Sequence, residues 1–68
     1  MTFQEWLMET LRSYRRELPN QRLGQWLFNQ LYNENPSLAD SVIGTELDPF
    51  YDDSCVGDFL LYAAEEWE

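Results

Sequence analysis

Hydrophobic residues recur every three or four positions over residues 2–18, which is the spacing of one face of an amphipathic helix. Thr2 followed by Glu5 fits a capping box that would satisfy free backbone N–H groups at the start of this helix. Pro19 is expected to end it. The predicted buried stripe consists of Phe3, Trp6, Leu7, Thr10, Leu11, Tyr14 and Leu18.

A second helical pattern covers residues 21–34, with Asn20 as its predicted cap. Its stripe is unusually wide, so we expect Trp26 or Phe28 to lie at a rim or an interface. Gly24 costs about 1 kcal/mol relative to alanine inside a helix, and the close approach of another helix would explain it. The apolar positions are Leu23, Trp26, Leu27, Phe28, Leu31 and Tyr32.

Two further helices are predicted in the second half of the chain. The pair Asn35-Pro36 favours a short helix over residues 36–43, which Gly44 would end in a left-handed conformation. This helix would bury its four apolar residues, and the last helix, about 54–66, would bury a longer stripe. The two stripes are Leu38, Ala39, Val42 and Ile43, then Val56, Phe59, Leu60, Ala63 and Trp67.

Between these helices, Asp48-Pro49 predicts a single helical turn through Phe50 and Tyr51, and Asp53 or Ser54 is expected to cap the last helix. We find no alternating run of β-branched residues that would predict a strand. The sequence therefore predicts a single all-α domain over residues 1–68. We expect a small bundle of three main helices plus a short helix and a helical turn.

Composition agrees with a folded globule, because 44% of the 68 residues are hydrophobic and 16% are aromatic. Charge is distributed unevenly. Residues 1–22 hold four arginines and three glutamates, or +1, whereas residues 23–68 hold ten acids and no base, or −10. Such a surface repels nucleic acid and anionic membranes and attracts basic protein surfaces. Three arginines come late in the first predicted helix, where positive charge stabilises the negative end of the helix dipole. This role is favoured over a binding patch for Arg12, Arg15 and Arg16.

The short apolar runs predict no membrane span, and the N-terminus lacks the pattern of a signal peptide, so we expect a cytoplasmic protein. The chain has no histidine, no lysine and the single cysteine Cys55, which disfavours nucleophilic catalysis and zinc. We therefore expect neither an enzyme nor a cofactor. A hard-cation site would use carboxylates whose spacing does not match an EF-hand, namely Asp48, Asp52, Asp53 and Asp58.

The densest negative charge lies in residues 45–54, which we call the acidic segment. Helix starts around a buried Phe50 explain most of this segment. We also expect Arg22 to pin the second helix to it through Asp48 or Asp52. The functional interpretation is an acidic surface with an aromatic centre that binds a partner. The predicted partner-binding residues are Glu46, Tyr51, Asp52, Asp53 and Asp58.

Several short motifs, in order, carry a resemblance to a known kind of protein. They are Arg22-Leu-Gly-Gln, then Asn29 and Leu31, then Asn-Pro-Ser-Leu-Ala from residue 35, Gly-Thr-Glu-Leu-Asp-Pro-Phe-Tyr-Asp-Asp from residue 44, and finally Trp67. Over residues 20–67 the chain resembles short acidic proteins of tailed phages and some bacteria. No activity is assigned to such proteins, so the resemblance transfers no catalytic residue. It implies a viral or mobile-element context, in which very small acidic proteins often inhibit or redirect a host protein.

Three functions are compatible with these features. The leading hypothesis is an interaction protein that binds a basic surface of a host protein in the host cytoplasm and inhibits or redirects it. The second is a nucleic-acid mimic, which would need its acids spread along one extended face. The third is a structural protein that forms a homodimer or larger assembly through an apolar seam of Trp6, Trp26 and Phe28.

Overall fold

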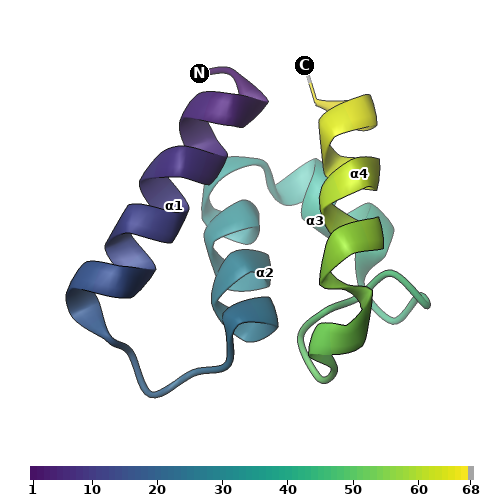
Figure 1. Cartoon of the computed structure of the whole chain (residues 1–68). Helices are drawn as coiled ribbons and strands as arrows, with labels where there is room; N and C mark the ends of the chain where they lie inside the picture. The colour runs from purple at the N-terminus through teal and green to yellow at the C-terminus, as the bar shows by residue number, and fades with distance from the viewer. Residues whose placement is uncertain (68) are drawn as a thin grey trace.

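The computed structural model describes residues 1–67 and confirms an all-α fold, with no strand in that range. The helices α1, α2 and α4 are joined by the shorter α3 and by η1, a single turn of 3-10 helix (Figure 1). The α1–α2 pair forms one side of the molecule, and α4 lies across α3 on the other. The elements are α1 (Phe3–Glu17), α2 (Leu23–Glu34), α3 (Pro36–Val42), η1 (Asp53–Cys55) and α4 (Val56–Glu66).

The first helix begins as predicted. The Thr2 hydroxyl accepts a hydrogen bond from the Glu5 N–H at 3.1 Å, and the Glu5 carboxylate accepts one from the Thr2 N–H at 2.8 Å. The end of α1 differs from the prediction at Leu18, which is 80% exposed and not part of the buried stripe. Its backbone turns into the left-handed region with φ +45°, which carries the side chain off the buried face of α1.

The second helix starts later than predicted. It begins at Leu23, so Asn20 is not its cap, and the actual cap residue, Arg22, makes no side-chain capping bond. The prediction that Trp26 or Phe28 lies at a rim or an interface is also wrong, because both are buried, at 9% and 7% exposure. The width of the apolar face is explained by the central position of α2, which packs against both α1 and α3.

The start of α3 agrees with the sequence signals. The Asn35 side chain accepts a hydrogen bond from the Leu38 N–H, and Pro36 occupies the first helical position. The helix ends at Val42 and leaves Ile43 49% exposed, so the prediction that Ile43 is buried is wrong. Gly44 takes the expected left-handed conformation, with φ +75°.

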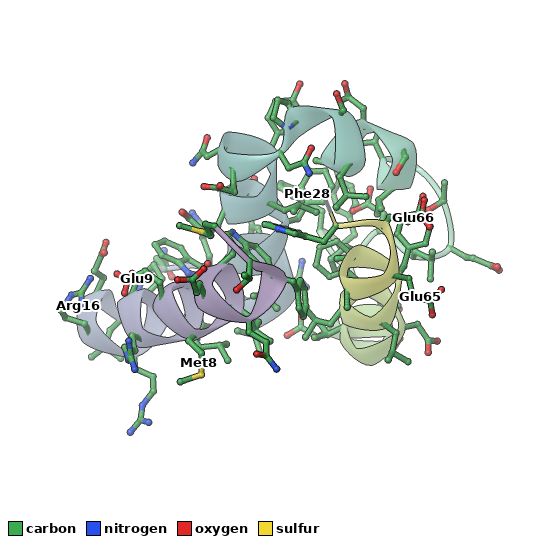
Figure 2. All side chains as sticks on the ribbon, turned by 90° about the horizontal axis from the view of Figure 1, so that it is seen from above. Met8, Glu9, Arg16, Phe28, Glu65 and Glu66 are labelled. Atoms are coloured by element: carbon green, nitrogen blue, oxygen red, sulfur yellow. The ribbon has the colours of Figure 1, made fainter. Side chains whose placement is uncertain are left out.

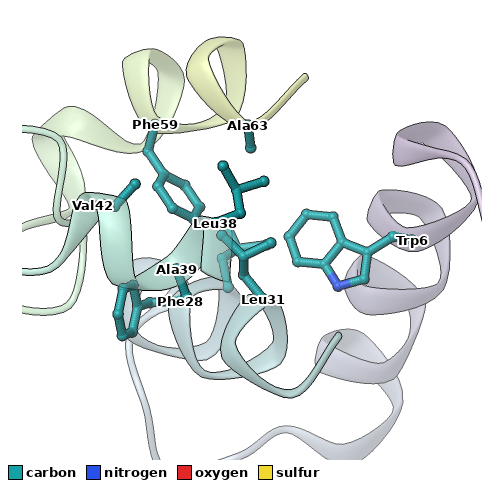
Figure 3. Packing of buried hydrophobic residues seen from close by; sticks show 9 residues of the cluster. Trp6, Phe28, Leu31, Leu38, Ala39, Val42, Phe59 and Ala63 are labelled. Atoms are coloured by element: carbon teal, nitrogen blue, oxygen red, sulfur yellow. The ribbon is translucent and has the colours of Figure 1, made fainter. Parts of the chain in front are cut away.

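The core lies where the four helices meet (Figure 3). Phe59 and Ala63 point from α4 onto α3, and both are fully buried. Trp6 enters the same cluster from α1. The buried apolar residues of the cluster are Trp6, Leu27, Phe28, Leu31, Leu38, Ala39, Val42, Phe59 and Ala63.

Aromatic contacts hold the two ends of the described chain together. The Trp67 ring lies 5.4 Å from that of Trp6 and 5.7 Å from that of Phe3, centroid to centroid. Its indole N–H donates a hydrogen bond to the Met1 carbonyl at 3.0 Å. The predicted stripe of the last helix therefore extends to Trp67. Within residues 1–67, none of the helices combines the length and apolar character needed to cross a membrane.

Candidate functional site

The acidic segment begins with a turn held by Asp48. One oxygen of its carboxylate accepts from the Gly44 N–H and the other from the Phe50 N–H, both at 2.9 Å. The chain turns at Pro49 and Phe50 without forming the helical turn predicted there; the single helical turn is η1, at residues 53–55. Asp48 therefore closes a loop between α3 and η1 and does not cap a helix.

Asp52 caps η1, because its carboxylate accepts a hydrogen bond from the Ser54 N–H at 2.9 Å. The sequence predicts Asp53 or Ser54 as the cap of the last helix. The difference arises because η1 precedes α4, whose own cap residue, Cys55, makes no side-chain capping bond. The Ser54 N–H, and to a smaller extent the nearby Arg22 guanidinium, lowers the pKa of the Asp52 carboxyl.

Asp53 reaches back across the molecule to the start of α2. Its Oδ1 accepts hydrogen bonds from the Gly24 N–H and from Arg22 Nη1, each at 2.9 Å. Arg22 also donates to the Phe50 carbonyl. Arg22 therefore pins α2 to the acidic segment as predicted, but through Asp53 and not through Asp48 or Asp52. The carboxylate also supplies the N-terminal cap that α2 lacks, at the positive end of its dipole.

The contact between Asp53 and the start of α2 requires a glycine at position 24. A Cβ atom built there would lie 2.4 Å from the Pro49 carbonyl oxygen and 2.5 Å from Asp53 Oδ1. The neighbour that approaches Gly24 is thus the loop before η1, with Pro49 fully buried against it, and not another helix as predicted. Together Arg22, Gly24 and Asp53 form what we call the α2 clamp.

Tyr51 projects from the clamped loop and is 83% exposed. Its ring meets the half-buried Phe50 edge-on, with centroids 4.8 Å apart, and Phe50 in turn packs against buried Phe28. Glu46 lies on the same loop and Asp58 in the first turn of α4; both are exposed and make no hydrogen bond or ion pair with any described residue. The carboxylates of Asp52 and Asp53, in contrast, already hold local structure.

The ion pairs formed by the arginines of α1 lie within α1 itself. Arg12, Arg15 and Arg16 are exposed, and Arg16 lies 4.0 Å from Glu9 and 3.9 Å from Glu17. Figure 2 shows Arg16 and the C-terminal glutamates of α4 on opposite sides of the molecule. Among residues 1–67, no three histidine, cysteine or acidic side chains are grouped so that they could hold a metal ion.

Removing the Asp52 cap should give a stability difference that depends on pH. Because the pKa of Asp52 is lowered in the folded chain, its contribution is present above the usual aspartate pKa of about 3.9 and is lost as the pH falls through the lowered value. We expect Asp52→Ala to lower the melting temperature at pH 7, and this deficit to close in strong acid. Thermal melts of the variant and the unmodified chain, at a series of pH values from 7 down to strong acid, measure this difference in melting temperature.

Glu46→Ala is the matched control, since it removes one negative charge from the same loop without removing a described hydrogen bond. Its effect on the melting temperature should be small. An Asp52→Ala deficit that persists unchanged in strong acid would show that the charged cap is not its cause.

No protein-family model matches this chain, and neither a curated protein nor a solved structure is significantly similar to it. The resemblance to short acidic phage proteins therefore stays a prediction from the motifs of residues 20–67. The partner-binding role of this loop and of Asp58 therefore also stays a prediction. The sequence pattern does not connect Gly24 with this loop, although a glycine inside a helix is the visible signal.

Proposed function

We propose that this protein binds a basic surface of another protein through Tyr51 and the carboxylates around it. The observation that carries the proposal is the exposed Tyr51 ring on a loop that Asp48, Asp52 and the α2 clamp hold in place. The proposed docking surface consists of Glu46, Tyr51, Asp52, Asp53 and Asp58. Asp53 would contribute through its half-exposed carboxylate, which already serves the clamp.

An exposed tyrosine on a fixed loop suits an interface. Tyrosine is enriched among the residues that carry most of the binding energy of interfaces, and a loop that is already ordered loses little conformational entropy on binding. The Phe50 ring packs edge-to-face with Tyr51, with the ring centroids 4.8 Å apart, so the exposed tyrosine has an aromatic neighbour in its own loop. These features favour Tyr51 as the anchor of the surface.

Charge indicates the chemistry of the partner. Residues 23–68 contain ten acids and no base, so the field of this half attracts a surface rich in lysine or arginine and raises the rate of encounter. The resemblance to short acidic phage proteins favours, as the partner, a host protein that this protein inhibits or redirects. Catalysis forms no part of the proposal.

Nucleic-acid mimicry is the weaker alternative. A mimic needs its carboxylates spread along one extended face, whereas Asp48, Asp52 and Asp53 are gathered in one segment, where they accept hydrogen bonds from backbone N–H groups of their own chain. Their positions follow the needs of turns and helix starts. This arrangement favours a compact docking surface over a row of phosphate-like charges.

The test is capture from bacterial lysate with the full chain as bait, compared among variants of equal far-UV circular dichroism. We expect Tyr51→Ala to lower the capture of a basic protein at least tenfold, because anchor residues typically contribute about 2 kcal/mol or more. Leu61→Ala is the control, since Leu61 is 64% exposed on α4 and outside the proposed surface. Equal capture by Tyr51→Ala and the unmodified chain would refute the proposal, and displacement of the captured protein by DNA would favour mimicry.

A further inference from the structure

The outer face of α1 is the second exposed feature of the molecule. Met1 and Met8 are 65% and 53% exposed, and Figure 2 shows Met8 pointing away from the other helices. A shallow groove runs along this face over about two and a half turns of the helix. It is lined by Met1, Gln4, Glu5, Met8, Glu9 and Arg12.

This face differs from the rest of the chain in its charge. The side chains of α1 comprise three arginines and three glutamates and sum to zero, whereas residues 18–68 hold ten acids and Arg22, or −9. Two copies that approach through surfaces built from residues 23–68, which hold ten acids and no base, bring like charges together, which costs free energy. The outer face of α1 allows two copies to meet without that repulsion.

The order of charges along α1 also selects an orientation. Glu5 lies three residues before Met8 and Arg12 lies four residues after it. A two-fold axis beside Met8 therefore places Glu5 of one antiparallel helix opposite Arg12 of the other, twice. A parallel pair would instead place Arg12 against Arg12.

We propose that the outer face of α1 binds a second copy of this chain, in an antiparallel pair centred on Met8 with reciprocal Glu5–Arg12 contacts. The 15 residues of α1 span only about 22 Å, so the interface belongs to the small, weak class. The seam predicted from sequence, with Trp6, Trp26 and Phe28, is not available because all three side chains are buried. The acidic segment lies on the other side of α2 from α1 and stays free in the dimer (Figure 1).

Sedimentation equilibrium of the full chain over a hundredfold range of concentration tests the pair. We expect a reversible monomer–dimer equilibrium. Met8→Glu should weaken the dimer at least tenfold, whereas Leu61→Glu, which adds the same charge at an exposed apolar site on α4, should leave it unchanged. A clean monomer throughout, or a dimer weakened by Leu61→Glu and not by Met8→Glu, would overturn the proposal.

A charge exchange tests the orientation. Arg12→Glu should weaken the dimer by placing acid against Glu5, and the double variant Glu5→Arg/Arg12→Glu should restore it. Glu5 belongs to the capping box, so circular dichroism must show that the double variant keeps its helices. A folded double variant that stays as weakly associated as Arg12→Glu would contradict the antiparallel pairing.

Discussion

Replacing Gly24 by alanine is expected to destabilise the protein by about 2–4 kcal/mol. Overfilling a packed site costs about 1–3 kcal/mol or more, and the new methyl group would also displace the Asp53 carboxylate from the Gly24 N–H. The gain in helix propensity, about 1 kcal/mol, is smaller than these losses. Neither obstacle moves easily: the Pro49 carbonyl is backbone beside a fully buried ring, and Asp53 is held by Arg22.

Urea unfolding followed by circular dichroism measures this loss, and Gly57→Ala is the matched control. Gly57 also lies within a helix, but a Cβ atom there meets no other atom within 4 Å. We therefore expect Gly57→Ala to stabilise the protein by about 0.5–1 kcal/mol. If both variants were stabilising, the close approach of the loop to Gly24 would be wrong.

Truncation of Asp53 should have the second largest effect, a loss of about 1–2 kcal/mol. The carboxylate caps α2, a role worth about 0.5–2 kcal/mol, while its half-exposed ion pair with Arg22 adds at most about 1 kcal/mol. Asp53→Ala also leaves the first turn of α2 without that acceptor. Urea unfolding at pH 7 measures the loss.

Arg22→Ala separates the two parts of this effect. In a double-variant cycle, Arg22→Ala and Asp53→Ala should couple, because each removes a partner of the other. Asp53→Ala should still destabilise a chain that already carries Arg22→Ala, since the bond to the Gly24 N–H remains to be lost. Strict additivity, or an unchanged melting temperature for Arg22→Ala, would contradict the clamp.

Local sequence signals predicted the parts of the fold that local contacts determine. The Thr2–Glu5 capping box, the Asn35 cap and the left-handed Gly44 each depend on residues within four positions. The exposure of Leu18 is not predicted, because the spacing of apolar residues does not indicate which residue ends the helix in a left-handed conformation. The hydrophobic pattern therefore predicts that the helices exist. It predicts where a helix begins or ends only when a capping residue is present.

The candidate site shows the opposite case. The partner of Arg22 lies 31 positions away, and four aspartates close in sequence offered equivalent carboxylates. The choice of Asp53 depends on how η1 and the loop pack against α2, which no local pattern encodes. For the same reason the pattern wrongly predicts Trp26 or Phe28 at a rim or an interface: the central position of α2 becomes visible only once α1 and α3 are packed against it.

The central claim is that Asp53 caps α2 and thereby fixes the loop that presents Tyr51. Amide hydrogen exchange at Gly24 tests it most directly, because first-turn N–H groups have no partner within their own helix. We expect the Gly24 amide, bonded to Asp53, to exchange much more slowly than those of Leu23 and Gln25, and to lose this protection in Asp53→Ala while Leu27 and Leu31 stay protected. A Gly24 amide that exchanges as fast as its two neighbours in the unmodified chain would contradict the claim.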